Sequence, residues 1–181
     1  MPTTLAARPR FRQDGGMPQH EDEVDRIVAA WGRERADLDF GPLEVLSRVD
    51  RLARHLDRAR RAAFDESDVE PWEFDVLSAL RRAGEPYELS PKTLLQQTLV
   101  SSGTMTNRVD RLTARGLVAR RTDPRDGRGI LVSLTSAGRT AVDAAIADLL
   151  AAERAILSGV SDAEQGQLSG LLRRLILGLG D

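Results

Sequence analysis

Five small polar side chains lie close together near the middle of the chain. They are Ser101, Ser102, Thr104, Thr106 and Asn107. On a helix that enters the major groove of DNA, hydroxyl and amide groups such as those of Thr104, Thr106 and Asn107 can hydrogen-bond to base edges. Serines at the start of a helix instead suit phosphate, through their hydroxyls and the helix N-terminal amides. Caps and solvated helix positions use the same residue types, so the five residues alone leave both interpretations open.

Positive charge collects in the same stretch. Residues 101–130 contain seven arginines and three aspartates, a local charge of +4, whereas the whole chain carries −2. The remainder is therefore acidic, at about −6. A basic segment on an acidic protein is better explained by a polyanionic partner than by solubility, and this favours DNA contact.

Three short helices are expected to position the polar run. Pro71 suits the first turn of one helix, and Ser90 caps the second. Either Ser101 or Ser102 caps the third, which Gly116 closes. Three such helices, the last with exposed polar residues, predict a helix-turn-helix.

A charged hairpin is expected directly after the third helix. Residues 117–122 and 129–134 have the composition of strands, and the Asp, Pro and Gly between them favour a turn. This arrangement predicts a wing, whose Arg125 and Arg128 could enter a narrow minor groove. Plain solvation of the turn is the competing interpretation, and it competes more strongly at Arg125.

Long apolar helices are expected on both sides of this unit. Their apolar faces exceed what one small domain can cover, so pairing with a second copy of the chain is expected. We predict a mainly α fold with a small β-hairpin wing (α+β), a winged helix-turn-helix that is dimeric through its terminal helices. The expected divisions are a disordered tail (1–18), N-terminal helices (19–64), the DNA-binding domain (65–134) and C-terminal dimerisation helices (135–181).

Several functional classes are disfavoured by composition. The chain has no cysteine, which excludes disulfides and thiolate metal sites, and its two histidines are far apart in sequence. It contains no motif of a nucleophilic hydrolase, P-loop or dinucleotide-binding enzyme, so we expect neither an enzyme nor a bound cofactor or metal. Without an apolar run long enough for a membrane span or a signal peptide, a cytoplasmic protein is expected.

The run DRLTARGLVARRTDPRDGRGILVSLTSAGR, positions 110–139, resembles the MarR family of bacterial transcription regulators in the order and spacing of its motifs. The similarity extends over about residues 43–177. It implies a homodimer that binds double-stranded DNA at a palindromic operator. Where the family's wing often has Asp-Arg-Arg, this chain has Asp126, Gly127 and Arg128, which puts the minor-groove contact in question.

An added N-terminal helix with a tryptophan is similar to a subgroup that responds to urate or to tricarboxylates such as aconitate and citrate. The resemblance implies that an anionic ligand binds at Trp31, Asp75, Arg108 and Arg120. An ion pair between Arg108 and Asp75 would be opened by the ligand, and the recognition helix would shift. A purely structural ion pair, core packing of Trp31 and phosphate contact by Arg120 are the alternatives.

These patterns together predict a ligand-responsive regulator, most simply a repressor, that a small anion releases from DNA. The alternative is a helical dimerisation or adaptor protein without sequence-specific DNA binding, which would leave the basic helix and wing unexplained.

Overall fold

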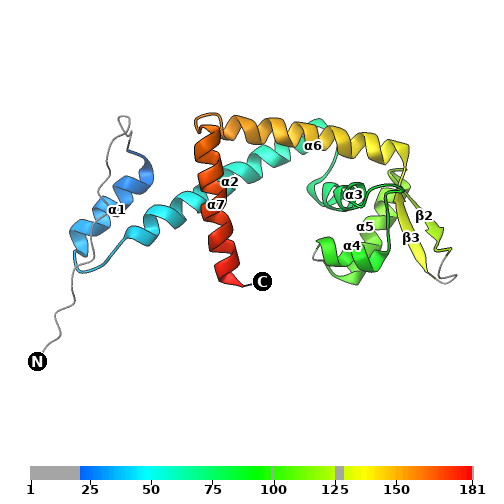
Figure 1. The fold of residues 1–181 in the computed structure, drawn as a ribbon, viewed down its shortest axis with the longest axis horizontal. Helices are drawn as coiled ribbons and strands as arrows, with labels where there is room; N and C mark the ends of the chain where they lie inside the picture. The colour runs from blue at the N-terminus through cyan, green and yellow to red at the C-terminus, as the bar shows by residue number, and fades with distance from the viewer. Residues whose placement is uncertain (1–20, 99, 125–128, 181) are drawn as a thin grey trace, which may run out of the picture. The chain divides into compact units, whose positions relative to one another are not determined.

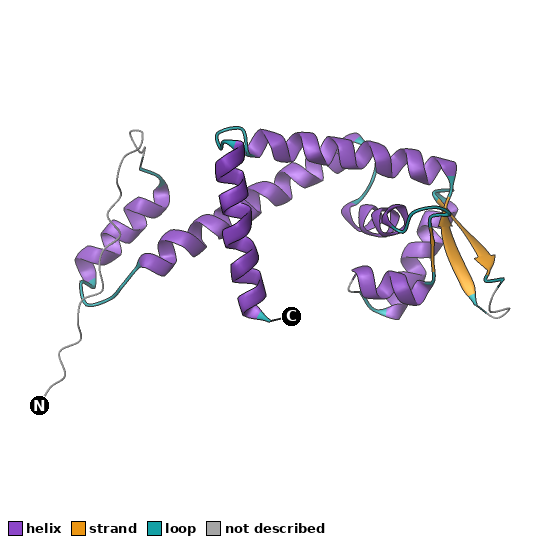
Figure 2. Ribbon diagram, in the orientation of Figure 1, coloured by secondary structure: helices purple, strands orange, loops and turns teal. Residues whose placement is uncertain are grey.

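The computed structural model describes residues 21–98, 100–124 and 129–180. It is mostly helical with one small antiparallel sheet, which confirms the predicted fold class (Figures 1 and 2). The elements are α1 (Glu23–Glu34), α2 (Gly41–Glu66), α3 (Pro71–Arg82), β1 (Glu88–Leu89), α4 (Pro91–Thr98), α5 (Ser102–Ala114), β2 (Val118–Thr122), β3 (Ile130–Leu134), α6 (Ser136–Ile156) and α7 (Asp162–Leu179).

The chain divides into two compact units between Leu52 and Ala53, within α2. The predicted tail, residues 1–18, lies outside the described residues. The four-part division proposed from the sequence remains a prediction.

In the first unit, α1 is tied to the first half of α2 by arginines. Asp22 caps α1 by accepting a hydrogen bond from the Asp25 amide at 3.0 Å. Arg48 of α2 donates to Asp22 at 2.8 Å and to Asp25 at 2.6 Å. The hydrogen bond from Arg48, followed by that from the Asp25 amide, lowers the pKa of Asp22 to about 2. This end of α1 is therefore fixed by charge, since Val24 is its one buried side chain.

The core of the second unit holds the three helices of the helix-turn-helix together. It joins the last turn of α2 to α3, α4, α5, the wing strands and α6. The inward-facing residues of α5, Met105, Val109 and Leu112, are at most 2% exposed. Because the inner face of α5 is fully packed, its outer face is held at a fixed place on the domain.

The predicted helix boundaries are confirmed by their caps. Ser101, not Ser102, is the N-cap of α5, because its side chain accepts a hydrogen bond from the Thr104 amide. Gly116 ends the same helix with φ of 72°, a left-handed conformation that glycine adopts without strain.

The wing is part of a three-stranded sheet of order β1-β3-β2. The two predicted arms pair antiparallel, with Val118 opposite Leu134 and Thr122 opposite Ile130. The sequence prediction missed β1, a two-residue strand in which Glu88 pairs with Ser133. Two residues without a hydrophobic alternation carry no strand signal, so only the tertiary pairing reveals β1.

The long helices leave apolar surface uncovered. No residue of α7 is buried, and its leucines and isoleucine are 37% to 84% exposed at positions 168, 171, 175, 176, 177 and 179. A groove of about 620 Å³ lies along this helix, lined by Leu157 at the end of α6 and by residues of α7 from Gln165 to Leu177. Such continuous exposed apolar surface marks an interaction face.

Candidate nucleic-acid interface and effector site

The outer face of α5 presents the polar run. Ser101, Ser102, Thr104, Thr106 and Asn107 are all exposed. Figure 1 shows α5 beside α4 on one side and the wing strands on the other. The five side chains are therefore all accessible from outside the domain, which is what contact with a groove of DNA requires.

The hydroxyls of this surface are partly occupied by the helix itself. The Thr104 and Ser101 hydroxyls lie 2.9 Å apart, and the Thr106 hydroxyl donates to the Ser102 carbonyl at 3.2 Å. Within the described residues, the side-chain amide of Asn107 makes no hydrogen bond. The side chain of Asn107 is therefore available for a hydrogen bond from outside the chain.

Arg125 and Arg128 lie outside the described residues, so their proposed minor-groove contact stays a prediction. The described part of the wing ends at Asp123 and Pro124 on one arm and resumes at Gly129 on the other, where the Asp123 amide bonds the Gly129 carbonyl at 2.8 Å.

Four arginines of the basic segment form intramolecular ion pairs. Arg111 contacts Glu70 at 3.1 Å, Arg115 contacts Glu73 at 2.5 Å, Arg120 contacts Asp110 at 2.6 Å, and Arg121 is paired with Glu88. Three of these carboxylates lie outside residues 101–130 and were not counted in the local charge. The positive charge available to a polyanion is consequently smaller than the segment's composition suggests.

Glu88 shows the effect of such pairing on a carboxyl group. The Arg121 hydrogen bond lowers the pKa of Glu88 despite its burial, and the Glu88 side chain is only 13% exposed. Both groups therefore remain charged at neutral pH.

Arg108 does not form the predicted ion pair with Asp75. Its guanidinium lies 5.7 Å from the centre of the Trp72 ring, which Arg111 also covers at 4.5 Å. One terminal nitrogen, Nη1, is buried and has no hydrogen-bond partner in the part of the chain that the structure describes. Charge and spacing alone did not indicate that Trp72, three residues before Asp75 on α3, would contact Arg108.

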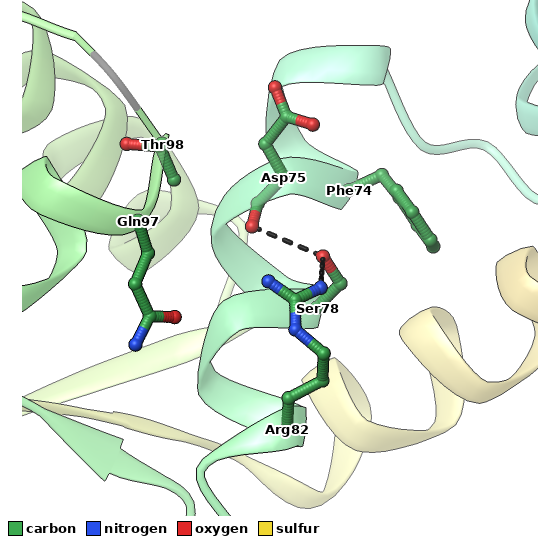
Figure 3. Close-up of a pocket in the computed structure, with 6 residues that line it drawn as sticks. All are labelled: Phe74, Asp75, Ser78, Arg82, Gln97 and Thr98. Atoms are coloured by element: carbon green, nitrogen blue, oxygen red, sulfur yellow. Dashed lines mark hydrogen bonds between the residues drawn. The ribbon is translucent and has the colours of Figure 1, made fainter. Parts of the chain in front are cut away.

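Asp75 lines two cavities of the second unit. One, of about 230 Å³, lies between α3 and α4, and Figure 3 shows Gln97 and Thr98 facing Asp75 and Arg82 across it. Arg82 donates to the Ser78 hydroxyl at 3.0 Å, and that hydroxyl donates to the Asp75 carbonyl at 3.2 Å. The other cavity, of about 340 Å³, also contains Arg60 and Arg61.

The four predicted ligand residues are therefore not gathered in one described cavity. Arg108 and Arg120 line neither cavity that contains Asp75. Trp31 belongs to the first unit, where it stacks on Phe40 and is 50% exposed. The arginines that do accompany Asp75, Arg60, Arg61 and Arg82, were not predicted, because they lie on surfaces that the sequence shows only as charged helix faces.

Among the residues described, no group of three or more His, Asp or Glu side chains is arranged to hold a metal ion. None of the described helices combines the length and apolar character needed to span a membrane.

Comparison of the sequence with known proteins identifies relatives that match most of the chain. Residues 67–129, from the start of α3 through the wing turn, match the MarR family. The chain is 35% identical over 153 residues to the HTH-type transcriptional regulator PecS of Dickeya dadantii, covering 84% of this chain and 92% of PecS.

Two solved structures share the fold. A MarR variant from E. coli complexed with operator DNA is 25% identical, with a TM-score of 0.61, and the match covers 75% of this chain and 96% of that one. BpsR of Bordetella bronchiseptica, whose DNA binding is regulated by 6-hydroxynicotinic acid, is 30% identical, with a TM-score of 0.55 and coverage of 71% and 98%. With an exposed polar helix beside a three-stranded wing and a relative that matches along most of its length, the chain belongs to the MarR family of transcription regulators.

Proposed function

We propose that the protein regulates transcription, most simply as a repressor, by binding a near-palindromic operator as a homodimer that a small anion releases. The observation that carries the proposal is the exposed polar start of α5, held on a packed core beside the wing. Operator binding by the similar MarR variant supports it. A cytoplasmic location would follow, because bacterial DNA is there.

The proposed dimer would bury the apolar surface of the long helices. Leu171, Leu175 and Ile176 of α7 are 49% to 60% exposed, and Ile146 and Leu150 of α6 also reach the surface. Two-fold pairing would present two α5 helices about one turn of DNA apart, roughly 34 Å, which requires an operator with two inverted half-sites.

The proposed roles at the DNA follow from side-chain chemistry. Asn107 would bond a base edge, with Thr104 and Thr106 beside it, whereas Ser101 and Ser102 would contact phosphate. Arg125 and Arg128 would reach into the minor groove. The wing arginines would then add affinity, and the α5 side chains would add sequence preference.

Replacing Asn107 with alanine should weaken operator binding by about tenfold to a hundredfold, since a bidentate base contact is worth about 1–3 kcal/mol. Binding to non-operator DNA and the melting temperature should change little, because Asn107 is exposed. Fluorescence anisotropy measures both affinities, with the duplex that the wild-type protein selects from a random library as operator and a scrambled duplex as non-operator DNA. Titration of the selected duplex at high concentration should give two chains per duplex.

The control is Gln167→Ala, a similar loss of an exposed polar side chain, on α7 but outside the lining of its apolar groove. Failure of the wild-type protein to select any sequence would refute the proposal and leave a dimerisation or adaptor role.

For the effector, we propose Arg108 as the main contact of the anion and Asp75, which lies on the same helix as the Trp72 that Arg108 covers, as a second residue of the site. A buried guanidinium nitrogen without a partner is costly, and an anion that bonded it would remove that cost. Regulation of the similar BpsR by 6-hydroxynicotinic acid supports a small anionic effector. Arg120 would join the site by leaving Asp110, and the ligand contact of Trp31 stays a prediction.

Urate, aconitate and citrate should be tested separately in the same assay. At least one should raise the melting temperature and lower operator affinity by about fivefold or more, the size expected of linked binding sites. Arg108→Gln should abolish that response while retaining operator binding. If none of the three anions changes either quantity, this ligand class is wrong, whereas operator binding would stand.

A further inference from the structure

Two adjacent arginines of the wing point to opposite faces of the sheet. Arg120 and Arg121 are neighbours on β2, and side chains alternate along a strand. Arg120 lies opposite the buried Val132, and Arg121 lies opposite Leu131 on the other face. Each arginine meets a carboxylate from a different element: Asp110 of α5 for Arg120, and Glu88 of β1 for Arg121.

The pair on the outer face has the more constrained geometry. Glu88 and Ala119 both lie opposite Ser133, so Glu88 shares a face with Ala119 and therefore with Arg121. Arg121 crosses over β3 to reach it. The Arg121 Nε donates to one oxygen of Glu88 at 2.7 Å, and Nη2 donates to the other.

This is a two-point pair between a planar guanidinium and a carboxylate, the arrangement that arginine also makes with phosphate. A phosphate oxygen and Glu88 would therefore compete for the same donors. Glu88 is mostly buried and fixed by the sheet, whereas Arg121 is 45% exposed and lies within reach of solvent.

We propose that Glu88 is a specificity-determining residue: by engaging Arg121 within the protein, it withholds one cation from the phosphates of non-operator DNA. The inference rests on the proposed DNA-binding function. Attraction to phosphate is independent of sequence, so each arginine withheld weakens binding to all DNA alike. Base contacts from α5 then account for a larger share of operator affinity.

The size of the effect follows from counterion release. Each phosphate neutralised adds about 0.9 to the slope of log affinity against log salt, which at 0.1 M salt corresponds to a factor of up to about eight. Releasing Arg121 should therefore raise non-operator affinity several-fold. Operator affinity should rise less, because the base contacts fix the position of the wing.

The experiment compares Glu88→Gln, Arg121→Gln and the double variant with the wild-type protein, on selected and scrambled duplexes from 50 to 300 mM salt. Gln keeps the shape of Glu88 but removes its charge. Glu66→Gln is the matched control, because it removes an exposed carboxylate for which no ion pair is found among the described residues. Melting temperatures identify any variant that fails to fold.

Glu88→Gln should bind scrambled DNA about threefold to eightfold more tightly than Glu66→Gln does, with a salt slope larger by about 0.9. The double variant should return to the wild-type value, and Arg121→Gln alone should not raise the affinity for scrambled DNA. Scrambled-DNA affinity that is unchanged or lower in a folded Glu88→Gln protein, or that stays raised in the double variant, would overturn the proposal. A wild-type protein that selects no operator would instead refute the proposed function. The comparison of Glu88→Gln with Glu66→Gln on scrambled DNA would still show whether Glu88 withholds Arg121 from phosphate.

Discussion

Replacing Gly138 with alanine should destabilise the protein by about 3 kcal/mol or more, because the added methyl group would overlap a backbone carbonyl. A Cβ atom at this position would collide with the Leu117 carbonyl oxygen and lie 2.9 Å from its carbon. The Leu117 carbonyl also accepts the Thr135 amide at 3.1 Å, and the Thr135 hydroxyl accepts the Gly138 amide at 3.0 Å. The clash would therefore separate the start of α6 from the start of the wing.

Differential scanning calorimetry should show a fall in melting temperature of roughly 6 °C or more, at about 2–4 °C per kcal/mol for a chain of this size. Gly32→Ala is the control, since nothing lies within 4 Å of a Cβ on that helical residue. It should be neutral or slightly stabilising, because alanine is the better helix former. Equal melting temperatures for the two variants would contradict the close approach of Gly138 to Leu117.

The second large effect is expected at the C-terminal end of α5. Arg115, the C-cap of α5, donates to Glu73 at 2.5 Å and to both the carbonyl and the carboxylate of Asp68. Glu73 is 1% exposed, so Arg115→Met would leave a buried carboxylate without its cation. We expect a loss of about 2 kcal/mol, less than for a fully buried pair, because the Arg115 side chain is 36% exposed.

Urea denaturation of a double-mutant cycle isolates the pair. Glu73→Gln in the Arg115→Met background should recover about half of the lost stability, because the glutamine side chain is neutral. Its oxygen can still accept the hydrogen bond that the Glu70 backbone N–H donates to Glu73 at 3.0 Å in the wild-type protein. Arg61→Met, which breaks an exposed pair with Asp57, should cost at most about 0.5 kcal/mol. Additive effects of the two substitutions at positions 73 and 115 would show that they do not interact.

The helix-turn-helix and the wing could be predicted from the sequence because local signals agree with the fold. Ser101 and Gly116 bracket α5, and Met105 and Val109 mark its buried face with helical spacing. Each of these signals acts within about one turn of helix, so no tertiary information was needed. The same holds for Ser161, whose side chain forms a capping box with Glu164 at the start of α7.

The partners of the arginines could not be predicted, because they depend on contacts between distant segments. Arg121 meets Glu88 across 33 positions and Arg115 meets Glu73 across 42. Arg108 was expected to bond Asp75, but Trp72 lies on the same helix one turn earlier and its ring receives the guanidinium. Charge and spacing identify which groups are able to pair, and the packing of α3 against α5 decides which ones do.

The exposure of α7 affects how the amount of folded, active protein depends on the concentration of the chain. Because no residue of this helix is buried by its own chain, its folding must draw on whatever covers it. If that cover is a second copy, newly made chains at low abundance would keep a frayed, protease-sensitive end until they meet. The supply of active regulator would then rise more steeply than the rate of its synthesis, and scarce chains would be cleared first.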